Sequence, residues 1–332
     1  MKKKNLLKIL FPVAFLTVGV AVGWFWGSHT NSNGSASGET PYMRLTGYKY
    51  ISPLLLCDDN EQKSSRSLLD LESKIQKEIN QKKLDGKLTD ASVFIRDINS
   101  GNQINVNPDV KYFPASLTKI PFMIAFLKAA ESQPDLLNKE AKVTLSMDYN
   151  ASQEVAPKES AKIGQSYKAD DMLSMMVKYS DNNSLYTLVK LLDQKTFNTV
   201  YEDLGLKFPS NVEEQVDYMT AYDFAYFLRI LYNSTYLKRD LSEKALGLMS
   251  ASDFDLGIKA GLPTDINLAH KFGLQTKTNG SVTERQMHDC GIVYDKDHPY
   301  VICMMTRSTE SIEEIESTMK DISSMAYAEM NQ

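Results

Sequence analysis

The order of its predicted strands and helices restricts the fold of this chain more than any other sequence feature. Apolar residues in the pattern of strands fill 91–98 and 103–106 near the start of the body, and 291–294 and 300–306 near its end. Turn residues separate the members of each pair. The four segments can share one sheet only if the two ends of the body come together, which indicates an α/β (α+β) fold.

Helical patterns fill the segments outside and between these strands. In 64–83, Leu68, Leu71, Ile75 and Ile79 recur at spacings of three and four, which is typical of an amphipathic helix. We expect further helices in 116–130, 170–179, 183–192, 221–232 and 311–330. The sequence therefore predicts a sheet assembled from both ends of the body around a helical insertion.

An uncharged run of 18 residues, 9–26, precedes the body. Its length is close to the roughly 20 residues that cross a bilayer, and it ends in an aromatic cluster. Lysines gather on its N-terminal side, so the positive-inside rule places residues 1–8 in the cytoplasm. We expect a single-pass membrane anchor, a flexible linker over 27–42 and a body over 43–332 outside the cytoplasm, with a cleaved signal peptide as the alternative.

Composition excludes two kinds of partner. The chain has 37 basic and 42 acidic residues, for a net charge of -5, and no basic run interleaved with aromatic residues. We therefore expect no binding of nucleic acid. Its 4 histidines are scattered without the spacing of metal ligands, so we expect no metal and no cofactor. Nothing in the sequence indicates the oligomeric state.

The 3 cysteines, if they lie outside the cell, cannot all form disulfides with one another. Cys290 and Cys303 flank the turn of a predicted hairpin. If Tyr294 pairs with Tyr300, Cys290 lies opposite Met304, and the two thiols point to opposite faces of the sheet. We therefore expect buried free thiols at these two positions.

Ser116 and Lys119 form a Ser-x-x-Lys motif at the start of the predicted helix 116–130. Residues three apart lie on the same face of a helix, so the amine of Lys119 can reach the hydroxyl of Ser116. A serine becomes a nucleophile when a neighbouring base takes its proton, and a lysine can be that base if burial and nearby positive charge lower its pKa. Alone, the motif is equally typical of a capped helix with a surface lysine.

Two further motifs follow, each weak by itself. Ser180, Asp181 and Asn182 would offer a hydroxyl, a carboxylate and an amide from one tight turn, although such residues favour turns anyway. Lys271 and Gly273 lie in a predicted strand. The lysine there could bind a carboxylate, and the backbone beyond the glycine could donate N–H groups.

Taken together and in this order, Ser-x-x-Lys, Ser-Asp-Asn and Lys-x-Gly resemble the motifs of class A β-lactamases and penicillin-binding proteins, the serine D,D-peptidases. Their separations, 64 residues and 91 residues, fit that superfamily as well. The resemblance implies an antiparallel sheet from 43–110 and 236–332, flanked by the N- and C-terminal helices, and an all-helical subdomain over 111–235. It also implies a serine hydrolase that forms an acyl-enzyme.

The resemblance assigns a role to each residue of the first two motifs. Ser116 would be the acylated nucleophile, Lys119 its base, and Ser180 the relay of a proton to the leaving group. Asn182 would orient the substrate amide and Lys119. Asp181 would brace its own turn.

The third motif would contribute to binding the substrate. Lys271 would face the substrate carboxylate, with Gly273 beside it in the strand. The N–H groups of Ser116 and Leu274 would form the oxyanion hole.

The first departure from the family pattern concerns deacylation. Between Asn182 and Met219 the sequence has no Glu-x-x-Leu-Asn motif, whose glutamate activates water in class A β-lactamases, and the loop is shortened. Glu213 or Glu214 could supply the carboxylate, although adjacent acids before a helix more often serve its dipole. Without such a base, acylation can proceed while deacylation stalls.

The second departure is Phe272, where the family usually has threonine or serine. A phenyl ring cannot donate a hydrogen bond to a substrate carboxylate. If the ring points into the cleft, carboxylate recognition weakens and falls mostly on Lys271; if it points into the core, little is lost.

These observations predict a membrane-anchored, extracytoplasmic serine hydrolase of the class A β-lactamase-like fold. Ser116 would form an acyl-enzyme with a β-lactam or with a D-Ala-D-Ala-like peptide of the peptidoglycan type. The missing loop glutamate leaves efficient β-lactam turnover open. The alternative is a non-hydrolysing penicillin-binding sensor or a cell-wall-binding pseudoenzyme.

Overall fold

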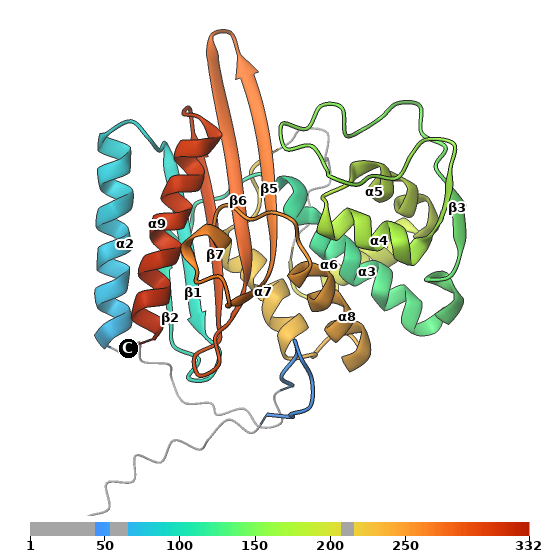
Figure 1. Cartoon of the computed structure of the whole chain (residues 1–332), viewed down its shortest axis with the longest axis horizontal. Helices are drawn as coiled ribbons and strands as arrows, with labels where there is room; N and C mark the ends of the chain where they lie inside the picture. The colour runs from blue at the N-terminus through green and yellow to red at the C-terminus, as the bar shows by residue number, and fades with distance from the viewer. Residues whose placement is uncertain (1–43, 54–65, 207–215, 332) are drawn as a thin grey trace, which may run out of the picture. The chain divides into compact units, whose positions relative to one another are not determined.

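A computed structural model describes residues 44–53, 66–206 and 216–331. Its central feature is a five-stranded antiparallel sheet with the strand order β2-β1-β7-β6-β5 (Figure 1). The strands are Asp90–Asp97 (β1), Gln103–Val106 (β2), Asn267–Asn279 (β5), Val282–Tyr294 (β6) and Tyr300–Ser308 (β7). Because β1 pairs with β7, strands from early and late in the chain share one sheet, as the sequence predicts.

Both faces of the sheet are buried along β1 and β7, which explains the mostly apolar sequences of these two strands. In β1, Val93 and Ile95 face one core, and Phe94 between them faces the other. The first core lies under helices α2 (Arg66–Leu84) and α9 (Ile312–Met330), which pack side by side (Figure 1). The second core lies between the sheet and the helical subdomain.

The helical subdomain is inserted between β2 and β5. Its helices are η1 (Ala115–Thr118), α3 (Lys119–Ser132), η2 (Pro134–Leu136), α4 (Ala169–Lys178), α5 (Asn182–Leu188), η3 (Val189–Leu191), α6 (Gln194–Asp203), α7 (Ala221–Tyr232) and α8 (Arg239–Ser250). The short turn η5 (Lys259–Gly261) follows them and packs against α9, on the opposite face of the sheet. A small ribbon pairs β3 (Glu140–Lys142) with β4 (Ser166–Lys168). Helix α3 is buried on nearly every side, in keeping with its apolar sequence.

Most of the predicted elements are confirmed, and α7 has the predicted bounds. The sequence analysis did not predict α6 and α8. Their apolar residues are interrupted by polar ones, and in α8 also by Gly247. Strand β6 is longer than predicted, because its N-terminal half carries polar residues that extend the hairpin with β5.

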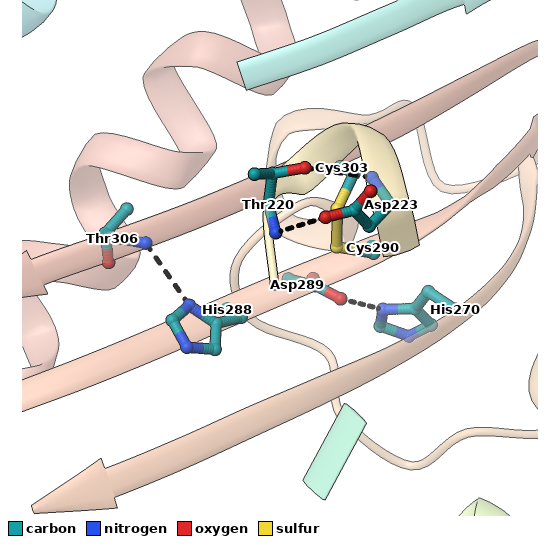
Figure 2. The surroundings of a disulfide bond; sticks show 8 residues. All are labelled: Thr220, Asp223, His270, His288, Asp289, Cys290, Cys303 and Thr306. Carbon is teal, nitrogen blue, oxygen red and sulfur yellow. Dashed lines mark hydrogen bonds and ion pairs between the residues drawn. A yellow bond between two sulfur atoms is a disulfide. The ribbon is translucent and has the colours of Figure 1, made fainter. Parts of the chain in front are cut away.

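The prediction of free thiols at Cys290 and Cys303 is wrong. Figure 2 shows these residues joined by a disulfide between β6 and β7. Tyr300 pairs with Val293 and not with Tyr294, so Cys290 lies directly opposite Cys303. A shift of one residue in register moves every side chain of a strand to the other face, and this shift brings the two thiols together.

Within the described residues, no helix is both long enough and apolar enough to cross a membrane. The predicted cytoplasmic tip, anchor and linker, residues 1–42, lie outside the part of the chain that the structure describes.

Removing the disulfide should destabilise the fold. The two cysteines are 13 residues apart, and closing a loop of this size restricts the unfolded chain by about 3 kcal/mol. We expect the Cys290→Ala/Cys303→Ala double variant to lose about 2–3 kcal/mol of unfolding free energy, measured by urea denaturation of the full-length chain in detergent. Wild type in a thiol reductant should lose a similar amount. Equal urea midpoints for oxidised wild type and the double variant would contradict the prediction.

Candidate active site

The partly buried Ser116 lies in the tight turn that leads into α3. Ala115, directly before it, has a left-handed φ of 48° and begins the 3-10 turn η1. Helix α3 continues from Lys119. A left-handed non-glycine residue is strained, and such strain is often found at functional sites. The turn holds the Ser116 and Lys119 side chains together on one side of the helix start.

The amine of Lys119 is surrounded by oxygen atoms. Its Nζ lies 2.9 Å from Ser116 Oγ, 2.9 Å from the carbonyl oxygen of Ser180, 3.1 Å from Ser180 Oγ and 2.7 Å from Asn182 Oδ1. An ammonium has three protons for these four oxygens. A neutral amine keeps a lone pair, which can accept the Ser116 proton. The geometry therefore suits proton transfer between Ser116 and Lys119.

The surroundings favour the neutral form of Lys119. The side chain is 1% exposed, and its burial, together with the positive charge of Lys271, lowers its pKa well below the usual value of 10.5. The carboxylate of Asp181 acts in the opposite direction but is the smaller influence. Burial and the charge of Lys271 thus shift Lys119 toward the neutral form, the form that could accept a proton.

Asp181 fixes the turn that brings Ser180 and Asn182 to Lys119. Ser180 has a left-handed φ of 60°, and Asp181 caps α5. The buried carboxylate accepts hydrogen bonds from the N–H groups of Ala161, Asn183 and Ser184, the Ser184 hydroxyl and the Asn150 amide. This is the bracing role that the sequence predicts for Asp181.

Gly273 allows β5 to lie against η1. A Cβ atom at this position would meet the carbonyl oxygen of Pro114 at 2.8 Å and the backbone nitrogens of Ser116 and Leu117 at 3.1 Å. Only a residue without a side chain fits at such distances. The contact brings the strand that carries Lys271 and Leu274 directly alongside the turn that carries Ser116.

A cleft of about 430 Å³ opens at this contact. It is lined by Ser116, Ser152, Gln153, Glu154, Val155, Asn182, Phe272, Leu274, Gln275 and Thr276. The structure thus brings together seven residues at or just beneath one cleft. They are the residues to which the sequence analysis assigns a role in catalysis or substrate binding. Glu213 and Glu214 lie outside the described residues. In the described part of the chain, no cluster of three or more His, Cys, Asp or Glu side chains could hold a metal ion.

Phe272 lines the cleft, and its neighbour Lys271 is buried next to it. Lys271 is fully buried, which lowers its pKa to about 7 despite the nearby carboxylates of Asp289 and Asp253. Phe272 is 4% exposed and stacks on Phe254, with ring centroids 4.2 Å apart. Phe272 therefore both lines the cleft and packs in the core. The sequence left open whether its ring points into the cleft or into the core, and the structure combines the two.

Gln286 and His288 hold the backbone that leads to Ser116, although no sequence motif singles them out. Gln286 accepts a hydrogen bond from the N–H of Phe113, and His288 Nε2 donates to the carbonyl oxygen of Phe113, both at 2.9 Å. Thr306 N–H donates to His288 Nδ1 (Figure 2), so the imidazole is neutral, and burial lowers its pKa to about 4. Their role depends on the position of β6 and has no local sequence signal.

His270 and Asp289 support β5 from the other face. Their side chains interact at 2.9 Å between Nδ1 and Oδ1 (Figure 2), and Asp289 also accepts a hydrogen bond from the N–H of Ile258. His270 thus points away from the Ser116 turn, as the alternation along a strand predicts.

The model of the beta-lactamase enzyme family matches residues 70–330. The chain belongs to this family. No curated protein matches the chain. The family assignment confirms the resemblance seen in the order of the three motifs.

Several solved structures share the fold. The TLA-1 extended-spectrum β-lactamase has a TM-score of 0.68 and 18% sequence identity, over 80% of this chain and 100% of that one. PBP-A has a TM-score of 0.65 and 20% identity, over 81% and 98%. A class A β-lactamase from Bacteroides cellulosilyticus has a TM-score of 0.65 and 18% identity, over 82% and 99%. These likenesses confirm the class A β-lactamase-like fold.

Replacing the carboxylate of Asp181 should destabilise the site and the fold. In Asp181→Asn, one acceptor oxygen becomes an NH₂ group that faces donors, so we expect a loss of about 3 kcal/mol of unfolding free energy in urea denaturation. The exposed Asp171 in the first turn of α4 provides the matched control. Asp171→Asn should cost no more than about 1 kcal/mol. Equal effects of the two substitutions would contradict the bracing role.

Proposed function

We propose that the chain is a serine hydrolase that forms a Ser116 acyl-enzyme with a β-lactam or with a D-Ala-D-Ala-like peptide of the peptidoglycan type. The observation that carries the proposal is the buried amine of Lys119, 2.9 Å from Ser116 Oγ and lowered in pKa. The PBP-A structures include an acyl-enzyme complex of a variant with penicillin G. Because PBP-A has the same fold, its acylation by penicillin G supports a β-lactam as a substrate of this chain.

Acylation would begin when Lys119 Nζ takes the proton of Ser116 and Ser116 Oγ attacks the substrate carbonyl carbon. The N–H groups of Ser116 and Leu274 would stabilise the oxyanion. As the C–N bond breaks, the leaving nitrogen would receive a proton through Ser180, whose Oγ lies 3.1 Å from Lys119 Nζ. Asn182 would orient Lys119 and the substrate amide. Lys271, beside Gly273, would lie next to the substrate's carboxylate position.

We propose that the acyl-enzyme is long-lived. Among the described residues that line the cleft, the only carboxylate is that of Glu154, which lies 3.5 Å from Arg285. An ion-paired carboxylate at the rim is a poor base for activating water. Glu213 and Glu214 are the remaining candidates for deacylation. A stable acyl-enzyme would equally suit the second function, a penicillin-binding sensor or cell-wall-binding pseudoenzyme without turnover.

We further propose that the hydrolase domain lies outside the cytoplasm. Residues 1–8 would form a cytoplasmic tip, 9–26 a single membrane span and 27–42 a flexible linker to the domain at 43–332. The Cys290–Cys303 disulfide supports this placement, because disulfides persist in oxidising compartments.

Intact mass spectrometry tests the proposal directly. We expect full-length wild type in detergent to gain the mass of one penicillin G and to keep it, and Ser116→Ala to gain none. Ser152 also lines the cleft, so Ser152→Ala is the matched control and should be acylated like wild type. Unmodified wild type together with hydrolysed drug would indicate β-lactamase turnover. Neither an adduct nor hydrolysis would overturn the proposed reaction.

The pH dependence of acylation should report the pKa of Lys119. The rate should rise with pH as Lys119 loses its proton and level off below the usual lysine pKa of 10.5. Since the charge of Lys271 lowers this pKa, Lys271→Met should move the midpoint of the profile to higher pH.

The profile is measured from the second-order rate constant of adduct formation at each pH. Lys277→Met, on the exposed part of β5, is the control and should leave the midpoint in place. Superimposable midpoints for wild type and Lys271→Met would contradict the proposed effect of the Lys271 charge on the pKa of the titrating base.

A further inference from the structure

We propose that Phe272 makes the cleft select acyl donors that are uncharged at the position nearest Lys271, such as an internal peptide segment, over donors with a free carboxylate there. The inference rests on the proposed acylation of Ser116 and narrows the substrate class of that same site. It replaces the carboxylate contact that the family resemblance gives Lys271 with a preference for an uncharged group at that position.

The ammonium of Lys271 is not presented to the cleft. Its side chain is 0% exposed, and its Nζ has no hydrogen-bond partner among the described residues. The Nζ instead lies 4.1 Å from the centroid of the Phe272 ring, within the range of a cation–π contact. A carboxylate entering the cleft would meet the phenyl ring before it met the ammonium.

The Phe272 ring is fixed in this position by packing. Phe254 stacks against it, with ring centroids 4.2 Å apart and planes inclined by 18°. Only 4% of Phe272 is exposed, and the residue belongs to the apolar core under α2 and α9. Moving the ring to uncover Lys271 would break this stack and expose buried apolar surface.

Electrostatics point in the same direction. Burial lowers the pKa of Lys271 to about 7, so near neutral pH much of the residue is an uncharged amine, which attracts a carboxylate only weakly. Glu154 adds a negative charge to the rim, although Arg285 lies 3.5 Å away and offsets it. A free carboxylate next to Lys271 would therefore lose its hydration and gain little attraction from this residue in return.

The part of β5 that follows Phe272 also suits an uncharged peptide. Strand β5 is at the edge of the sheet, and Leu274, Gln275 and Thr276 line the cleft. An edge strand can pair with an extended peptide through its backbone. An internal peptide segment fits these groups better than a chain end.

Penicillin G and its methyl ester form a matched pair of probes, because the ester lacks the negative charge of the free carboxylate. Acylation of the full-length chain in detergent is followed by intact mass. We expect wild type to react with the ester at least as fast as with the acid. Phe272→Thr uncovers Lys271 and adds a hydroxyl, so it should shift the rate ratio toward the acid by about tenfold or more. Phe272→Leu keeps an apolar cover and should retain the wild-type ratio.

Two results would overturn the inference: a clear preference of wild type for the acid, or an unchanged ratio in Phe272→Thr. Thermal unfolding checks that Phe272→Thr folds without its stack on Phe254. If it does not fold, the ratios of wild type and Phe272→Leu decide, and a preference of either protein for the acid contradicts the inference.

Equilibrium binding to Ser116→Ala, measured by NMR titration, separates this inference from the proposed acylation. Tighter binding of the ester than of the acid supports the inference even if wild type forms no adduct, in which case only the proposed reaction fails. Tighter binding of the acid, or no binding of the ester, contradicts the inference even if Ser116 is acylated.

Discussion

A lysine amine buried against a serine hydroxyl is the interaction on which the rest of this structure depends. Removing an amine from water costs free energy unless polar partners replace the water. Lys119 finds its partners in Ser116, Ser180 and Asn182, which come from two separate parts of the helical subdomain. The arrangement is possible only because the carboxylate of Asp181 fixes the second part. The same burial that requires these contacts lowers the pKa of the amine and prepares it to act as a base.

The sheet contributes the other half of the site through its edge strand. Gly273 lets β5 touch the backbone of the Ser116 turn, and β6 holds the preceding Phe113 peptide with Gln286 and His288. Ser116 therefore lies where the sheet meets the helical subdomain, fixed from both sides. Strand pairing between β6 and β7, with the disulfide across it, supports that position from behind.

Membership of the beta-lactamase enzyme family and the details of the cleft lead to different expectations for the substrate. The residues around Ser116 reproduce the motifs of a serine acyl-enzyme, whereas Phe272 covers Lys271 with an aromatic ring. One strand thus carries the close contact of Gly273 with the Ser116 turn and, one residue earlier, the ring that lies against Lys271. The chemistry of acylation and the choice of acyl donor can differ independently in such a site, because they depend on opposite faces of the same strand.

The sequence by itself determined most of the elements and the three motifs that meet at the cleft. The Ser116–Lys119 spacing, the Ser180–Asn182 turn and the periodic apolar residues of α2 and α9 are local patterns, and local spacing fixes which side chains share a face. Only the tertiary structure decided the features that depend on contacts between segments far apart in the sequence. The register of β6 against β7 differs by one residue from the sequence-based prediction, and this alone joins Cys290 to Cys303. Packing between elements also places Phe272 against Lys271. It likewise brings Gln286 and His288 of β6 to the backbone of Phe113, where they form hydrogen bonds. No short stretch of sequence carries a signal for either arrangement.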